Sequence, residues 1–205
     1  MCIIMRCYSG MVGFLVYMIG IYGGTFDPPH AGHIHVATTL QKFLHLREVW
    51  WVVTKRNSLK PACSEGLLQR KAQVRILLYN YAKMRLIDDL ESARSIDVVQ
   101  QLHRRHPSEK FVFIAGTDVI LGLHKWFRWK ELCVTMPIIF LERPGYIYNV
   151  IHRPFCAAIE RIPHPNHESI REVSSGWGIV RAGRNFMSSS SIRRQRMCRK
   201  SLNNE

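Results

Sequence analysis

Short continuous apolar runs alternate along this chain with longer stretches in which apolar residues recur at helical spacing. The first run, residues 18–22, contains almost no polar position, which is typical of a strand buried on both faces of a parallel sheet. Ile34, Ala37 and Leu40 then follow a helical period and predict a helix that begins near Gly32. These residues predict a strand–turn–helix unit.

The same alternation continues as far as residue 142. Further apolar runs predict strands at residues 48–54, 85–88, 110–115 and 136–142. One helix is expected at residues 67–82 and another from Ser95. In the first of these the helical period is followed by Leu68, Ala72, Arg75, Ile76 and Tyr79, with Arg and Lys on the other side.

Strands that alternate with helices predict an α/β fold. We expect a Rossmann-like, doubly wound, mostly parallel sheet with helices on both faces. Residues 146–178 are less informative and are expected to form loops around one short strand, residues 157–162, with His164 and His167 in a solvated loop. A length of 205 residues favours a single domain. We place it at residues 18–195, between an N-terminal extension (residues 1–17) and a basic tail (residues 196–205).

The turn between the first strand and the first helix is rich in glycine and histidine. Gly23 and Gly24 allow the backbone to turn sharply and to approach a ligand without a Cβ atom in the way. His30 and His33 lie at the start of the helix, where unpaired N–H groups and the helix dipole attract phosphate. We therefore predict a phosphate site; the alternative is that both are ordinary loop and helix-cap histidines.

Two common phosphate loops are excluded, because the chain has no G-x-x-x-x-G-K-[ST] run and its glycines are not spaced G-x-G-x-x-G. A metal site is not expected either, because His35 points away from its neighbours on a helix and no acidic or cysteine partner lies near. The six cysteines are scattered without metal-like spacing, and we interpret them as free cytosolic thiols.

The run G-G-T-F-D-P-P-H-A-G-H at residues 23–33 resembles the signature of the nucleotidylyltransferases with an H-x-G-H motif, and its Pro-Pro-His form resembles bacterial nicotinate-nucleotide adenylyltransferase. The resemblance implies that nicotinate mononucleotide attacks the α-phosphorus of ATP directly, without a covalent intermediate, and releases deamido-NAD and pyrophosphate. It implies that His30 and His33 bind the triphosphate, with His33 on the reacting phosphate. It also implies that the backbone of Gly23, Gly24, Thr25 and Phe26 lines the nucleotide cleft.

Separated motifs extend the resemblance to about Arg194. The resemblance implies that phosphate contacts come from Lys60, Ser189, Ser190 and Arg193, and nucleotide contacts from Ser95, Asp97, Gly116, Asp118, Trp126 and Arg143. Ordinary alternatives exist: a helix N-cap for Ser95, a solvated basic loop around Lys60, core packing for Trp129 and a serine linker before Arg193.

The resemblance departs at Arg94 and Val98, which replace a tyrosine and a threonine of the family pattern. Contacts to the nicotinate side are therefore unsettled at this segment, although Arg94 could itself meet a carboxylate. Preference between the acid and the amide mononucleotide stays open. Nicotinamide-mononucleotide and phosphopantetheine adenylyltransferase are the alternative activities.

The net charge of +14 suits an anionic substrate. A basic RNA-binding protein is the non-enzyme alternative, but no recognisable RNA module is present and no nucleic acid is expected. The uncharged apolar run at residues 11–22 is too short to span a bilayer, so we expect a cytoplasmic protein without a membrane partner. Mg²⁺ is expected to arrive with ATP, and an oligomer is compatible with the sequence.

Overall fold

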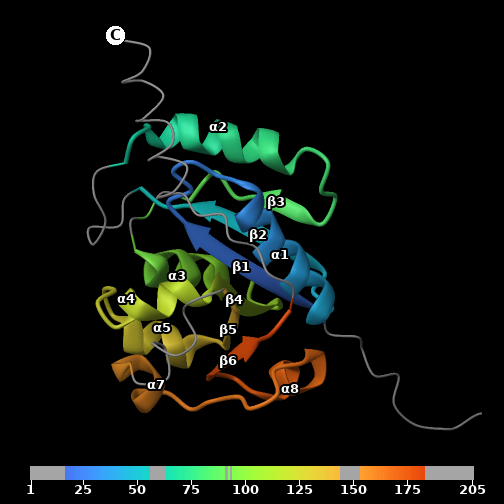
Figure 1. Ribbon diagram of the computed structural model, residues 1–205, viewed down its shortest axis with the longest axis vertical. Coiled ribbons are helices and arrows are strands. Elements are labelled where there is room, and N and C mark those ends of the chain that lie inside the picture. Colours follow the sequence, from blue (N-terminus) through green and yellow to red (C-terminus); the bar gives the residue numbers. More distant parts are fainter. Residues whose placement is uncertain (1–16, 56–62, 91, 93, 144–152, 183–205) are drawn as a thin grey trace, which may run out of the picture.

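The computed structural model describes residues 17–55, 63–90, 92, 94–143 and 153–182. Its centre is a six-stranded sheet with the order β3-β2-β1-β4-β5-β6 (Figure 1), and all neighbouring strands are parallel. The strands are β1 (Met18–Gly24), β2 (Glu48–Val53), β3 (Met84–Leu86), β4 (Lys110–Gly116), β5 (Ile138–Leu141) and β6 (Trp177–Val180).

The strand order reverses at β1, which pairs with β2 on one side and with β4 on the other. The chain first moves outward from β1 to β3, then returns to β4 and moves outward again to β6. This is the doubly wound arrangement that we expected. In such sheets ligands bind at the carboxyl ends of the strands where the order reverses, which is here the ends of β1 and β4.

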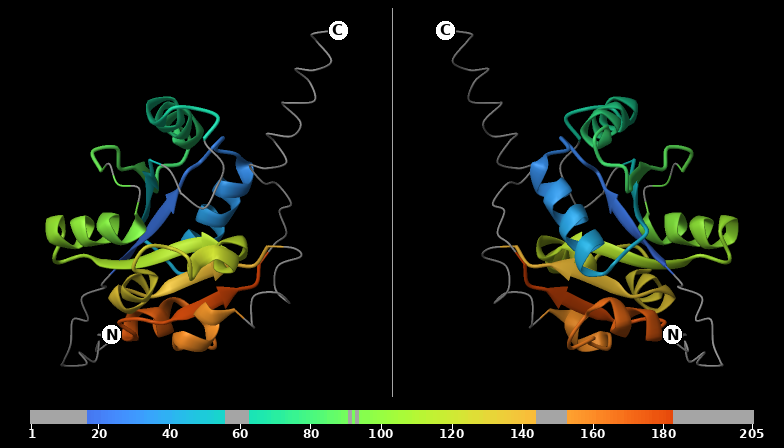
Figure 2. Two further views of the ribbon diagram at one scale, coloured as in Figure 1. Left: turned by 90° about the vertical axis from the view of Figure 1, so that its left-hand side faces the viewer. Right: turned by 90° about the vertical axis from the view of Figure 1, so that its right-hand side faces the viewer.

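Helices cover both faces of the sheet (Figure 2). Their bounds are α1 (Ala31–Phe43), α2 (Leu67–Leu78), α3 (Ser95–Arg105), α4 (Ile120–Leu123), α5 (Trp129–Thr135), α7 (Pro154–Ala158) and α8 (His167–Glu172), with a 3₁₀ turn η1 (Thr117–Val119). One apolar core contains residues of α1, α2 and α8, and the other contains residues of α3, α4, α5 and α7. Successive side chains of a strand point to opposite faces, so β1 contributes Ile19 and Ile21 to one core and Met18 and Tyr22 to the other.

The four further strands predicted up to residue 142 are present, with ends shifted by at most two residues. The strand predicted at residues 157–162 is wrong. Residues 154–158 form α7 instead, and Arg161 makes only an isolated bridge to Trp177. The last strand of the sheet is β6, whose Gly178 weakens its strand pattern in the sequence. Hydrogen bonds to the buried strand β5 stabilise β6 although its own strand propensity is low.

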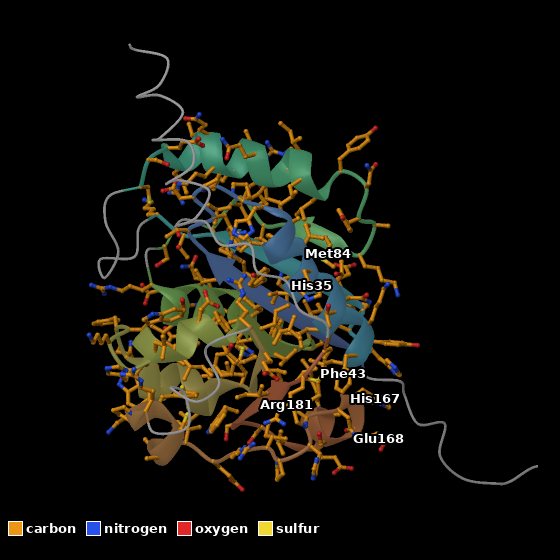
Figure 3. All side chains as sticks on the ribbon, in the orientation of Figure 1. His35, Phe43, Met84, His167, Glu168 and Arg181 are labelled. Atoms are coloured by element: carbon orange, nitrogen blue, oxygen red, sulfur yellow. The ribbon has the colours of Figure 1, made fainter. Side chains whose placement is uncertain are left out.

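The loop predicted around His164 and His167 is also only partly correct. His167 begins α8 and lies beside the segment that follows α1, in the same part of the view as Phe43 (Figure 3). Its ring stacks on that of His45, with the ring centroids 4.6 Å apart. The described residues contain no helix that is long and apolar enough to cross a bilayer.

The packing face of α2 is the opposite of the one that its apolar period suggests. Leu68, Ile76 and Tyr79 are 78%, 76% and 88% exposed. Arg70 and Lys71, which the period places on the outer side, are buried. Their charged groups donate to main-chain carbonyls, so both cations remain hydrogen-bonded inside the protein.

Candidate active site

The turn after β1 packs closely on the apolar core through Phe26. Gly23 and Gly24, which were expected to form the turn, are instead the last two residues of β1. A Cβ atom at Gly24 would lie 3.0 Å from Cζ of Phe26, so a side chain here would require the Phe26 ring to shift by a few tenths of an ångström. Phe26 has a positive φ of 46°, and its buried ring packs on Tyr22 and Trp51 at centroid distances of 5.4 and 4.9 Å. The Phe26 side chain therefore supports the turn from the core, and only its backbone is available to a ligand.

His30 and His33 stand side by side at the start of α1. His30 is the N-cap residue, and its Nδ1 accepts a hydrogen bond of 3.0 Å from the N–H of Gly32. Nδ1 of His33 accepts one of 3.2 Å from the N–H of His30. The two rings are 3.8 Å apart between centroids. The cap histidine alternative is thus correct as local structure, and it also sets how both rings face.

The hydrogen bonds also determine where the protons are. An imidazole nitrogen that accepts a hydrogen bond carries no proton, so the neutral ring has its N–H at Nε2. Burial, followed by the positive charge of Arg143, lowers the pKa of His30 to about 4, and the ring is neutral at pH 7. Nε2 of His30 is buried and has no hydrogen-bond partner among the described residues. A buried donor without an acceptor is costly, and an anionic oxygen would satisfy it.

The opposite wall of the site comes from the ends of β4 and β5. The N–H of Arg143 donates to Oγ1 of Thr117 at 2.9 Å, and its guanidinium lies 3.3 Å from the carboxylate of Asp118. A Cβ atom at Gly116 would lie 2.5 Å from Oδ1 of Asp118 and 2.8 Å from Nε of Arg143. Glycine at this position therefore allows the ion pair to lie across the end of β4.

The two walls belong to one site. Arg143 contributes electrostatically to the lowered pKa of His30. Burial raises the pKa of Tyr22, near the end of β1. The charge of Arg143 opposes this rise and the charge of Asp118 adds to it. Arg143 thus acts electrostatically on both His30 and Tyr22 from the ends of β4 and β5, beside the point where the strand order reverses.

The remaining described candidates lie across the sheet, on the side of α3 and α5. Trp126 is half-buried, and its ring meets that of Phe113 edge to face at 6.3 Å between centroids. The carboxylate of Asp97 accepts a hydrogen bond of 3.0 Å from the hydroxyl of Ser92. Ser95 is not the helix cap, because Arg94 occupies that position and Ser95 lies within the first turn.

Arg94, the departure from the family pattern, has a specific neighbour. Its guanidinium lies over the ring of Phe127, 3.9 Å from the centroid. The contact joins the start of α3 to the segment that follows α4, so Arg94 and Trp126 lie on the same side of the sheet. The nucleotide contacts predicted for Trp126, Ser95 and Asp97 stay predictions.

Four predicted phosphate-binding residues, Lys60, Ser189, Ser190 and Arg193, lie outside the described residues, and their roles stay predictions. Within the described part of the chain, no three His, Cys, Asp or Glu side chains are grouped closely enough to hold a metal ion.

Sequence reasoning missed three residues that support the site. The carboxylate of Asp27, which lies inside the motif, accepts hydrogen bonds from the backbone and the hydroxyl of Ser64 at 2.8 and 2.5 Å. Arg70 donates to the carbonyl of Thr25 in the same turn and to those of Thr54 and Lys55 after β2. Asp27 could have been found from its position inside the motif. Arg70 could not, because the helical period placed it on the outer side of its helix.

Comparisons with known proteins identify the family of the chain. The cytidylyltransferase-like family model matches residues 21–195. A relative from Methylorubrum extorquens, named "Probable nicotinate-nucleotide adenylyltransferase", is 34% identical over 186 residues, covering 85% of this chain and 98% of the relative. A relative of the same name from Mesorhizobium japonicum is 31% identical, covering 86% of this chain and 93% of the relative.

A solved structure gives the same fold. It is the nicotinic acid mononucleotide adenylyltransferase of Plasmodium falciparum complexed with NaAD, with a TM-score of 0.64 at 23% identity. The likeness covers 87% of this chain and 83% of that one.

Proposed function

The chain belongs to the cytidylyltransferase-like family and, within it, to the nicotinate-nucleotide adenylyltransferases of NAD biosynthesis, and we propose that His30 and His33 are the groups that bind the triphosphate of ATP during adenylyl transfer. The phosphate of nicotinate mononucleotide attacks the α-phosphorus of ATP. A new P–O bond forms, the bond from the α-phosphorus to the bridging oxygen breaks, and pyrophosphate leaves with the electron pair. The products are deamido-NAD and pyrophosphate.

The observation that supports this most directly is the buried Nε2–H of His30, which has no acceptor among the described residues. Both histidines use Nδ1 to accept a backbone N–H, and the neutral ring of His30 therefore presents a donor at Nε2. A phosphate oxygen fits the Nε2 donor of His30, and the N-terminus of α1 adds its partial positive charge.

Phosphoryl chemistry of this kind requires positioning and charge stabilisation from the protein, with little covalent participation. The site accordingly needs no nucleophilic side chain. Arg143, held by Thr117 and Asp118, adds a fixed positive charge opposite the histidines. We propose that ATP enters as its Mg²⁺ complex. Phosphate oxygens and water are ligands that Mg²⁺ accepts readily, and the described residues offer no cluster of acids as a separate cage.

Substrate choice is tested by pyrophosphate release from ATP with nicotinate mononucleotide, nicotinamide mononucleotide and phosphopantetheine in parallel. We expect the highest kcat/KM with nicotinate mononucleotide. Preference for phosphopantetheine would overturn the assignment, and preference for the amide would move it to the nicotinamide-mononucleotide enzymes.

The role of the histidines is tested by His33→Ala. Loss of a hydrogen bond to the reacting phosphate should reduce kcat by at least about 100-fold, the range seen for one oxyanion donor, while the fold is retained. His35→Ala is a matched control on the same helix, where it should leave turnover unchanged. Full activity of a folded His33→Ala enzyme would contradict the role.

A further inference from the structure

One arginine is buried beside the turn between β1 and α1 (residues 25–30), where we place the phosphate site; we call this segment the phosphate turn. Arg70 lies in the first turn of α2 and is 1% exposed. Its side chain is among the largest of those that are fully buried. An arginine in such a place is unusual, because a buried charge is costly unless its hydrogen bonds are satisfied. Its position therefore calls for a specific account.

The guanidinium of Arg70 binds backbone from three segments. Nη1 donates to the carbonyl oxygens of Thr25 and, at 3.0 Å, of Thr54. Nη2 donates to the carbonyl of Lys55 at 2.8 Å, and Nε donates to that of Glu65 at 3.1 Å. Within the described part of the chain, every acceptor is a main-chain carbonyl.

Three of these carbonyls belong to the loops that follow β1 and β2. Thr25 is in the turn after β1, and Thr54 and Lys55 follow β2. The N–H of Thr54 also donates to the carbonyl of Gly24 at 2.9 Å. On the same turn, Asp27 accepts from Ser64, ahead of α2. The phosphate turn is therefore held to β2 and to the start of α2 by side chains that do not face the substrate.

Peptide geometry carries this restraint to the site itself. In a trans peptide the C=O and the following N–H point in opposite directions. Arg70 draws the carbonyl of Thr25 inward, and the N–H of Phe26 is thereby directed away from Arg70. Because the guanidinium is a planar fork with fixed donor directions, it restrains this peptide more tightly than an ammonium group would.

We propose that Arg70 is a positioning residue for adenylyl transfer, which fixes the peptide between Thr25 and Phe26 so that its N–H faces the triphosphate. The proposal rests on the function proposed above, since it presupposes a triphosphate at this turn. Arg70 itself does not touch the substrate.

The neighbouring residue provides a matched control. Lys71 is also buried on α2, and its Nζ donates to the carbonyl of Asp88 at 2.6 Å, in the segment after β3. A purely structural role would make the two cations equivalent, because each holds α2 to the sheet by bonds to carbonyls. A positioning role makes only Arg70 matter for turnover.

The test compares Arg70→Lys and Arg70→Met with Lys71→Met, at temperatures well below the Tm of each variant. We expect Arg70→Met to lower kcat by at least tenfold and to raise the KM for ATP, and Arg70→Lys to do so less. Lys71→Met should lower the Tm while kcat and KM stay within twofold of the parent. Unchanged kcat and KM in a folded Arg70→Met or Arg70→Lys enzyme would overturn the proposal.

A second measurement does not depend on activity. Amide hydrogen exchange of residues 23–26 should be faster in Arg70→Lys than in the parent, and unchanged in Lys71→Met. Equal exchange in both variants would overturn the positioning role. If the parent released no pyrophosphate but the turn loosened only in the Arg70 variant, the proposed function would fail while the restraint on the turn would stand.

Discussion

His30 combines two properties that seldom occur together, burial and an unused donor. As the N-cap of α1 it accepts the N–H of Gly32, which leaves its proton on the opposite nitrogen. Protonation of the ring would remove this acceptor and place a charge beside Arg143. The local capping geometry and the low pKa of His30 therefore favour the same neutral form.

This low pKa predicts a pH dependence of stability. The folded pKa of about 4 lies below the ordinary value of 6.5, so the unfolded chain binds more protons between these values. Stability from this group is complete above pH 6.5 and is lost as the pH falls toward 4, by up to about 3 kcal/mol.

The variant His30→Asn keeps a capping acceptor and removes the titration. We expect its free energy of unfolding, measured in urea from pH 4 to 7, to depend less steeply on pH than that of the parent. A residual slope should remain from His103, whose pKa burial also lowers. Identical slopes in the two proteins would contradict the assignment.

Gly116 gives a second prediction for a single residue. In Gly116→Ala the new methyl group would push apart Asp118 and Arg143, whose side-chain ends can move at modest cost. We therefore expect kcat/KM in pyrophosphate release to fall at least tenfold, with only a small drop in Tm. Gly122→Ala, where a Cβ would meet nothing within 4 Å, is the control: it should leave kcat/KM unchanged and should not lower the Tm, because alanine favours the helix α4.

At the scale of elements, α2 is the most instructive helix. Its exposed face carries Leu68, Ile76 and Tyr79, and its buried face carries Arg70 and Lys71. The helical period identifies the helix correctly, but not the side that packs. Carbonyls from three loops converge on Arg70 and make it the better inward residue, and no local pattern reports such acceptors.

This orientation of α2 can be checked by substitution. Ile76→Lys changes an exposed residue and should alter the free energy of unfolding by less than about 0.5 kcal/mol. Val74→Ala removes methyl groups from a fully buried position and should cost about 1–3 kcal/mol. Urea denaturation of both variants measures the difference. A larger loss for Ile76→Lys than for Val74→Ala would mean that the helix packs the other way.

At the scale of the whole molecule, the strand order creates the site. Because β1 lies between β2 and β4, the histidine turn meets residues that come much later in the chain: Gly116, Asp118 and Arg143. The supporting network of Asp27, Ser64 and Arg70 is also non-local. The ion pair of Arg143 and Asp118 and the neutral ring of His30 thus lie on opposite sides of the reversal of the sheet.

The sequence by itself determined the features that depend on neighbouring residues. Apolar runs predicted β1 to β5, and the spacing of His30 and His33 predicted their shared position at a helix start. The expected turn at Gly23 and Gly24 is wrong, because both glycines pair with β2 as the last two residues of β1. Hydrophobic period and helix capping act over a few residues, and they can therefore be read along the chain.

Only the tertiary structure decided which segments meet. It placed Arg143 opposite His30, turned Arg70 inward, and completed the sheet with β6 where a strand at residues 157–162 had been predicted. Each of these depends on partners far away in the chain: a second charge, a set of carbonyl acceptors and a neighbouring strand. Their energy comes from packing and hydrogen bonds that form only when the whole sheet is assembled.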